Sequence, residues 1–302
     1  MSNWLRVAPF LFLILWSGGF VFVKIGLAYA DPLTFLALRY VCALAILSVL
    51  FLLIRPPIPA GSKSWLHLIV IGILLQGGYF PFTYLGLKYG MSAGAIALIT
   101  AQQPVLVGLL APVIAGEKVD AIRWLGLVLG VAGAGLVIVA RSSIGVASPT
   151  GLLFAIAALL SITSGILWQK RFPTSSHAVL ANLVQYAVGL AITAPLAFFL
   201  EPMRVDWVPG LFGSLAYLVL GNSIVAISLL LAMVKYGEAS KVSALFFLVP
   251  PTTAFIAFVL LQETIPTLAL PGFALSACGI YLVMHTQTNA RYLKRARLSP
   301  PS

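Results

Sequence analysis

Charged residues are scarce in this chain of 302 residues, at 8% of the sequence, whereas a typical soluble domain has about 25%. Apolar residues make up 61%. A soluble chain of this length has no core large enough for that much apolar surface, and disordered segments are polar and charged. The composition therefore excludes a soluble and a disordered protein, and it predicts a polytopic membrane protein.

Cysteine is also scarce. Cys42 and Cys278 both lie in long apolar runs, which excludes a disulfide framework and a thiolate metal cluster. The net charge of +11 comes from basic residues spread between apolar stretches, so no basic face for a nucleic acid is visible. The sequence lacks a Gly-rich nucleotide loop, a zinc-protease motif and paired catalytic carboxylates. We therefore expect no catalytic residue, no metal site and no cofactor.

Ten apolar stretches can cross a bilayer, whose core of roughly 30 Å needs about 20 residues per helix. Transmembrane β-strands would alternate apolar and polar residues, which these uninterrupted runs do not. The second stretch contains Arg39, so a buried arginine must be tolerated there. The predicted helices are approximately 8–28, 32–54, 65–86, 91–114, 122–140, 151–170, 178–200, 209–234, 241–262 and 267–286.

Lysine and arginine concentrate in the loops on the side of the amino terminus, and the loops of the opposite side hold Lys88, Arg141 and Arg204. Because cytoplasmic loops carry an excess of these residues, we expect a cell inner membrane protein with both termini in the cytoplasm. The basic tail over 288–302 then faces the anionic inner leaflet, so membrane lipids are expected partners.

An internal repeat relates the two halves at an offset of 147 residues, or 146 after a one-residue deletion. The matched positions are Lys88-Tyr89-Gly90 with Lys235-Tyr236-Gly237, Pro104 with Pro251, and Glu117 with Glu263. Five helices per half is an odd number, so the second copy enters the membrane in the opposite orientation, as in many secondary transporters. We predict an all-α fold of two inverted five-helix repeats, over 1–141 and 148–287, followed by the tail.

Several short motifs carry a family resemblance. They are Trp16-Ser17-Gly18-Gly19-Phe20, Lys24-Ile25-Gly26, Asp31-Pro32-Leu33-Thr34-Phe35 with Arg39, and Ala93-Gly94-Ala95 followed by Pro104 and Gly116-Glu117. With them the chain resembles the drug/metabolite transporter superfamily, in particular the EamA-type exporters with two tandem five-helix domains. The resemblance covers nearly the whole chain and implies secondary transport. It does not identify a substrate, because the family handles amino acids, sugars, nucleotides, vitamins and drugs.

Amide side chains inside the predicted helices are candidates for the solute site, because polar groups are costly in hydrocarbon. Gln76 and Asn222 lie at the middle of their helices and match at the 146-residue offset, and Gln102 and Gln103 lie near the middle of theirs. Amides both donate and accept hydrogen bonds, so they can orient a solute without a charge. The alternative is that they bind neighbouring helices.

Aromatic side chains near these amides suit a flat or partly apolar solute. Trp16 lies in the middle of the first helix, Tyr79 lies one turn from Gln76, and Phe247 precedes the proline pair of the second half. Helix packing is the alternative explanation for each. Arg39 either extends outward toward Asp31 or offers a cation to a substrate carboxylate.

Pro104 and Pro251 occupy matched positions in two helices. Each removes a helix hydrogen bond, so we expect hinges for alternating access or, alternatively, structural kinks. Lys24, near the outer end of the first helix, is expected to be an interface anchor. Small residues give helices 122–140 and 267–286 faces for close packing, which also allow a homodimer.

We therefore expect a secondary transporter that exports a small organic solute, such as an amino acid or a related compound, by alternating access. The alternatives are import of a vitamin, sugar or nucleotide-like metabolite and, in different classes, a membrane-embedded enzyme or a scaffold. The acidic residues all lie in loops or at helix ends of the predicted spans. Because proton-coupled carriers commonly keep a titratable group at depth, we expect transport without obligatory proton exchange.

Overall fold

The computed structural model describes residues 4–103, 105–107, 110, 121–142, 148–172, 176–226, 229 and 248–282. Regular secondary structure in these ranges is helical, apart from an isolated bridge between Ala30 and Val205. Six of these helices are long and apolar enough to cross a membrane, and four shorter apolar helices accompany them. The all-α class of a polytopic membrane protein is therefore confirmed. The count of ten helices stays a prediction.

The helices of the first half are α1 (Trp4–Gly26), α2 (Pro32–Ile54), α3 (Ser62–Leu74), the π-helical segment η1 (Leu75–Tyr79), α4 (Phe80–Lys88), α5 (Ala93–Thr100) and α7 (Ala121–Ser142). Proline suits the first turn of α2 because no N–H donor is needed there. Arg55, in the left-handed conformation, ends the helix. Ser92 caps α5 by accepting a hydrogen bond from the N–H of Ala95 at 3.1 Å.

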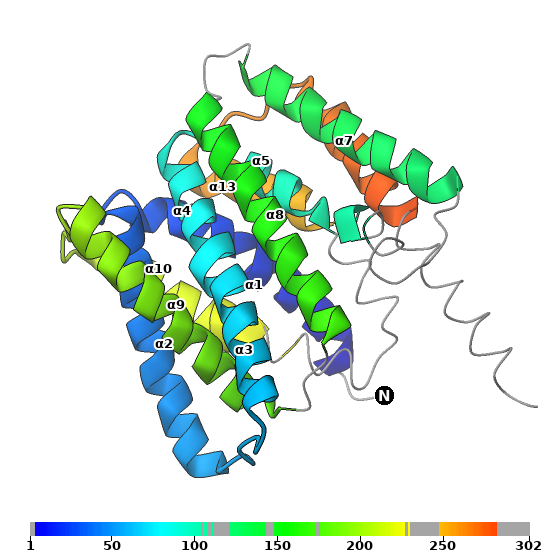
Figure 1. Ribbon diagram of the computed structural model, residues 1–302. Helices are drawn as coiled ribbons and strands as arrows, with labels where there is room; N and C mark the ends of the chain where they lie inside the picture. Colours follow the sequence, from blue (N-terminus) through cyan, green and yellow to red (C-terminus); the bar gives the residue numbers. More distant parts are fainter. Residues whose placement is uncertain are drawn as a thin grey trace, which may run out of the picture.

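The helices of the second half are α8 (Pro149–Arg171), α9 (Ala178–Leu200), α10 (Pro209–Ala216), the π-helical segment η2 (Tyr217–Ala226), α13 (Val249–Leu261) and an apolar helix over Ala269–Leu282. The last of these is orange-red in Figure 1. Each described helix overlaps one of the predicted spans, and α3, η1 and α4 together correspond to the span 65–86. The predicted residues Pro104 and Phe247 and the tail over 288–302 lie outside the described residues.

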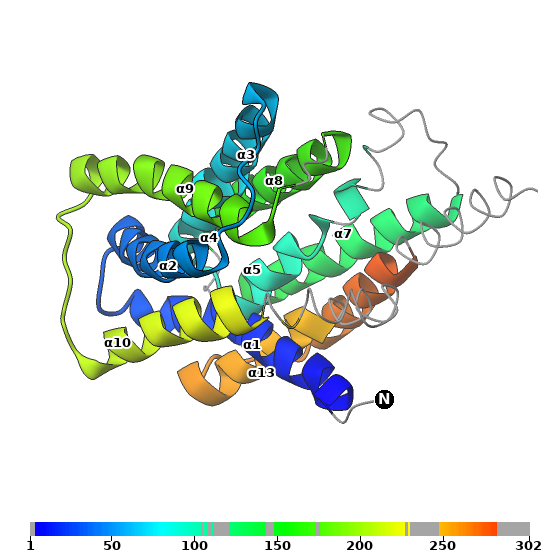
Figure 2. The ribbon, with the colours of Figure 1, turned by 90° about the horizontal axis from the view of Figure 1, so that it is seen from below.

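The helices of the two halves interleave. The helix α2 packs against α9 and η2, and α1 packs against α10 and α13 (Figure 2). Fully buried side chains of the core come from both halves, with Tyr40 and Tyr84 from the first and Leu211 and Leu218 from the second. The functional residues near this core are therefore held by helices that are distant in sequence.

In the described residues each half contains one π-helical segment, and the two are matched, since the equivalent of η1 at the 146-residue offset is 221–225 within η2. The wider π turn leaves carbonyls without their usual helical partners. Ser161 Oγ donates to the carbonyl of Leu74, the residue before η1, and Tyr40 Oη donates to the Gln76 carbonyl within η1, both at 2.7 Å. Side chains of α8 and α2 therefore stabilise the segment that carries Gln76.

The two small-residue faces pack against each other within the chain. Ser276 Oγ donates to the Gly130 carbonyl at 3.1 Å, and a Cβ at Gly133 would collide with the backbone around Gly272. Figure 1 shows α7 alongside the 269–282 helix. Small residues allow this approach of two helix backbones. These faces therefore contact each other within the chain, and a homodimer through the helices 122–140 and 267–286 remains a prediction.

The loop between α9 and α10 holds the first turn of α2. The Glu201 carboxylate accepts hydrogen bonds at 2.9 Å from two backbone N–H groups of that turn, which satisfies donors that a helix start leaves free. Asp31 accepts the N–H of Arg204 at 2.8 Å. Arg204 also donates to Asp206 and thereby lowers the pKa of that carboxyl. These bonds anchor α2, which carries Arg39, to the second half.

Candidate functional site

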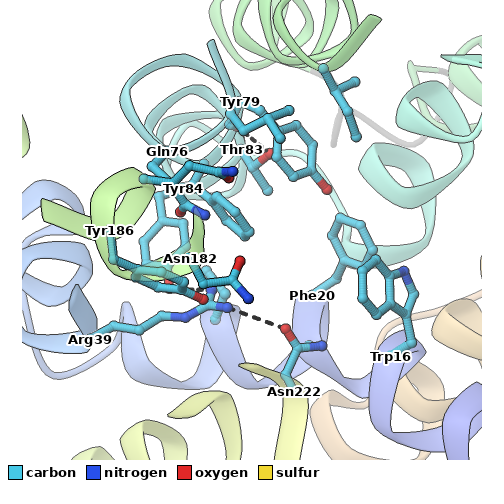
Figure 3. Close-up of a pocket in the computed structure, with 16 residues that line it drawn as sticks. Trp16, Phe20, Arg39, Gln76, Tyr79, Thr83, Tyr84, Asn182, Tyr186 and Asn222 are labelled. Atoms are coloured by element: carbon cyan, nitrogen blue, oxygen red, sulfur yellow. Dashed lines mark hydrogen bonds between the residues drawn. The ribbon is translucent and has the colours of Figure 1, made fainter. Parts of the chain in front are cut away.

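A cavity of about 220 Å³ lies between helices of both halves (Figure 3). This is smaller than the sites of drug-sized ligands, at about 300–1,000 Å³, so the cavity suits a small solute. Its walls come from α1, α2, η1 and α4 of the first half and from α8, α9 and η2 of the second. The lining residues are Trp16, Gly19, Phe20, Val23, Arg39, Leu75, Gln76, Tyr79, Phe80, Thr83, Tyr84, Ile162, Asn182, Gln185, Tyr186 and Asn222.

Arg39 brings a positive charge to the cavity, although its side chain is only 2% exposed. Its Nη2 donates to Oδ1 of Asn222 at 3.2 Å and to Oγ of Ser223 at 3.1 Å, and its Nη1 donates to Tyr84 at 3.3 Å. The guanidinium also lies over the Phe80 ring, 4.8 Å from the centroid, which is a favourable cation–π geometry. Its Nε has no hydrogen-bond partner. In the part of the chain that the structure describes, neutral groups thus hold this cation.

Asn222 lies between Arg39 and α1. Its Nδ2 donates to the Leu15 carbonyl at 3.3 Å, and a Cβ on Gly19 would come within 2.8 Å of the same nitrogen. The absence of a side chain at Gly19 therefore permits the approach of η2 to α1. Tyr186 donates to Ser223 at 2.9 Å, so α9 joins the same polar network.

Gln76 and an aromatic wall complete the cavity. The Oε1 atom of Gln76 is buried without a hydrogen-bond partner, a situation that costs about 1–3 kcal/mol. A solute that donates to this oxygen would remove that cost. Trp16 and Phe20 lie opposite Arg39 across the opening, and Tyr79 borders it beside them (Figure 3). The site can therefore bind an organic molecule with one polar end and one apolar end.

The structure brings five predicted site residues together around the cavity: Trp16, Arg39, Gln76, Tyr79 and Asn222. Arg39 does not extend toward Asp31, which binds the backbone of Arg204 instead. A role in solute binding remains a proposal for all five residues.

Gln102 and Gln103 are not among the residues that line this cavity, and their role in binding a solute remains a prediction. Gln102 is buried, its Nε2 donates to the Leu98 carbonyl one turn earlier at 3.3 Å, and its Oε1 points at Gly130 of α7. Its side chain therefore faces a different helix interface. Pro251 lies in the first turn of α13, where a missing N–H breaks no helical bond. The described helix is thus not interrupted at Pro251, and a hinge there remains a prediction.

Several cavity residues were not predicted from the sequence, notably Tyr84, Asn182, Gln185 and Tyr186. Two signals point to them. Tyr84 lies two turns after Gln76 on the same helix face. Gln185 is the repeat equivalent of Arg39 at the 146-residue offset, and Asn182 lies one turn before it.

Lys24 is not a simple interface anchor, because it pairs with a residue of the other half. Its Nζ lies 2.5 Å from Oε1 of Glu263, just beyond the end of α13, and 3.5 Å from the carbonyl of Met91. The side chains of the pair are 30% and 10% exposed. The neighbouring residue Val23 lines the cavity. The ion pair therefore joins α1 of the first half to the end of α13 in the second, one residue along the chain from the cavity residue Val23.

These features define a class: a polytopic helical membrane protein with a small, partly polar cavity between its two halves. The sequence profile of the EamA-like transporter family matches residues 6–139 and again 149–285. The chain belongs to this family of transporters. The two matches fall one in each half of the chain, and the repeat boundaries over 1–141 and 148–287 remain a prediction.

Relatives of similar length exist in bacteria. The chain is 26% identical to "Uncharacterized transporter YvbV" of Bacillus subtilis, over 92% of this chain and 90% of that protein. It is 24% identical to "Probable amino-acid metabolite efflux pump" of Salmonella typhimurium, over 90% and 92%. A solved crystal structure matches 99% of this chain and 100% of its own, with a TM-score of 0.63 at 20% identity. That last similarity concerns the fold alone.

Proposed function

We propose that this protein exports a small organic metabolite, an amino acid or a related compound, across the cytoplasmic membrane by alternating access. The observation that carries the proposal is the cavity, which lies between the two halves and combines Arg39 and the unpaired amide oxygen of Gln76 with an aromatic wall. The Salmonella typhimurium relative is named an amino-acid metabolite efflux pump, which supports export and the substrate class.

Alternating access requires that each end of the cavity can close. The Lys24–Glu263 pair supports such a closure, because it joins α1 to the end of α13 beside the cavity residue Val23. Thr253 of α13 also donates to the Ser17 carbonyl of α1 at 3.1 Å. In the proposed orientation, with both termini in the cytoplasm, this end faces outward. Opening the pair would then admit solvent from outside while the inner end closes.

Membrane lipids surround the helices in this proposal. Large apolar side chains on the outer helix surfaces are exposed, among them Leu52 and Leu53 of α2, Phe198 and Phe199 of α9, and Val128 of α7. Contact with hydrocarbon is the environment in which such exposure is favourable. The basic residues of the loops favour the cytoplasmic orientation of the termini.

The test is a metabolite-resistance and efflux screen in cells that overproduce the protein, followed by transport in proteoliposomes. We expect resistance to at least one amino acid or derivative, and flux of the same solute only in liposomes that contain the protein. Cells with the empty vector and protein-free liposomes are the controls. Two results would contradict the proposal. One is that cells with the protein show the same resistance to every organic solute as cells with the empty vector, and the other is a resistance with no matching solute flux in proteoliposomes.

A further inference from the structure

The positive charge of the cavity has no counterion in the part of the chain that the structure describes. Each acidic side chain described there binds elsewhere: Glu201 binds the first turn of α2, Asp31 binds the backbone of Arg204, Asp206 binds its side chain, and Glu263 binds Lys24. Among the described residues, the hydrogen-bond partners of Arg39 are neutral oxygens, and its ring contact with Phe80 is also neutral. A buried charge at membrane depth is costly and is normally paired. An anion bound next to Arg39 would therefore stabilise its buried charge.

The contacts of Arg39 also leave part of its hydrogen-bonding capacity unused. Its bonds to Tyr84, Asn222 and Ser223 are 3.1–3.3 Å long, whereas charge-assisted bonds to a carboxylate are about 2.7–2.9 Å. Its Nε is unused. The planar guanidinium matches a carboxylate with two parallel hydrogen bonds. A carboxylate would therefore form stronger hydrogen bonds with Arg39 than the neutral partners that it replaces.

The remainder of the cavity defines the rest of the ligand. Opposite Arg39, Trp16 and Phe20 offer an apolar surface (Figure 3), and the Oε1 of Gln76 lacks a donor. The described lining contains no carboxylate that could bind an ammonium group. A solute with three such groups would fit the cavity: a carboxylate would bind Arg39, an apolar body would pack on Trp16 and Phe20, and a neutral donor would bind Oε1 of Gln76. A zwitterion would leave its ammonium group without an opposite charge.

We propose that the substrate is a monoanionic carboxylate with an apolar body, such as a 2-hydroxy acid or an N-acylated amino acid, and that Arg39 is its counterion. The inference rests on the proposed function and narrows its substrate class. The loaded cavity is then electrically neutral, whereas the empty one carries the charge of Arg39. Each export cycle moves one negative charge outward, which an inside-negative membrane potential favours.

This charge movement supplies the driving force without a proton. Moving one elementary charge across a potential of 100 mV releases about 2.3 kcal/mol. This energy can maintain a substrate concentration about 50-fold higher outside the membrane than inside. No titratable carboxylate at depth is then required. The absence of an acid from the described cavity lining and the export direction thus have the same physical explanation.

The binding test compares solutes that differ only in charge. Phenyllactate, phenyllactamide, phenylalanine and phenylalaninamide share one body, and the equivalent set with a leucine side chain offers a smaller one. We expect thermal stabilisation of the purified protein by at least one hydroxy acid, with an affinity about ten-fold or more above that of the zwitterion and the amides. Arg39→Gln should remove this preference, and Arg39→Lys should retain it in part. Tighter binding of a zwitterion, an unchanged preference in Arg39→Gln, or no binding of either acid would overturn the proposal.

The flux test uses proteoliposomes under a potassium diffusion potential. Labelled hydroxy acid should accumulate on the positive side, and a pH gradient at zero potential should drive no accumulation. A flux of the hydroxy acid that does not change with the membrane potential would overturn the inference. The two proposals fail differently: a neutral or zwitterionic solute found by the efflux screen would overturn this inference and leave the transport function intact, whereas absence of any flux would overturn the function.

Discussion

Removing the charge of Glu263 should open the outer end of the cavity. Glu263→Gln keeps the shape of the side chain but breaks the ion pair with Lys24, whose side chain is 30% exposed against 10% for Glu263. An exposed pair contributes about 0.2–1 kcal/mol, and breaking a fully buried one costs about 3–5 kcal/mol. A pair of intermediate burial should contribute about 2 kcal/mol to the closed state, which is a factor of about 30 in the ratio of closed to open.

Thiol labelling measures this ratio. Thr83 lines the cavity, so Thr83→Cys provides a probe once the native Cys42 and Cys278, which are both exposed, are replaced by alanine. A membrane-impermeant thiol reagent added to intact cells should label this cysteine slowly. Adding Glu263→Gln should increase the rate by about ten-fold or more.

The control exchanges the two charges. In Lys24→Glu with Glu263→Lys the attraction between the side chains is kept, so slow labelling should return. A labelling rate that is unchanged by Glu263→Gln, or that stays high in the exchanged pair, would refute the assignment of this ion pair to the closure.

Four further outcomes follow from the structure. Gln76→Leu should abolish transport, and Gln102→Leu, at an equally buried glutamine outside the cavity, should leave the transport rate in proteoliposomes near that of the wild type. Gly133→Val should destabilise the protein by about 1–3 kcal/mol through overpacking against the 269–282 helix, visible as a lower unfolding temperature. A reporter enzyme inserted near Pro202 should report an external location, and a cytoplasmic one would contradict the topology. Gln185→Arg, which adds a second cation to the cavity wall, should shift ligand preference from monocarboxylates to dicarboxylates such as succinate in thermal-shift measurements.

The helices could be predicted from the sequence because the bilayer imposes one demand on every span, a long apolar run. The predicted range 32–54 coincides with α2, although Arg39 lies inside it. The structure shows why the arginine is tolerated: Tyr84, Asn222 and Ser223 accept hydrogen bonds from its guanidinium inside the protein. Nothing in the sequence near Arg39 identifies these partners, which come from other helices.

The rotation of a helix about its axis was harder to predict than its extent. A helix that is apolar on all sides gives no amphipathic signal for the face that meets a cavity. Gln76 could be placed because Tyr79 follows it one turn later and Asn222 matches it in the other repeat. Gln102 and Gln103 are adjacent, so they point to different sides of the helix, and the sequence does not distinguish a cavity from a helix interface. The structure directs Gln102 toward α7.

Contacts between segments that are distant in the sequence could not be predicted from short sequence patterns. Lys24 and Glu263 are 239 residues apart, and the repeat relates Glu263 to Glu117 rather than to Lys24. The small residues of α7 and the 269–282 helix did predict close packing. They could not predict the partner, because a helix of the same chain and one of a second copy present the same chemistry to such a face.

The function of the cavity depends on where the two repeats differ. Both carry a π-helical segment at the matched position, and both place an amide there, Gln76 in one and Asn222 in the other. Asn222 is engaged by Arg39 and by the Leu15 carbonyl, whereas Gln76 keeps a free oxygen. This difference arises because the equivalent of Arg39 is the neutral Gln185. A symmetric pair of arginines would repel each other across a small cavity and would require a dianion. One arginine with one free amide instead gives the cavity one polar end that carries a single positive charge. This end determines the orientation of a bound solute, and its charge determines the charge of the solute that moves.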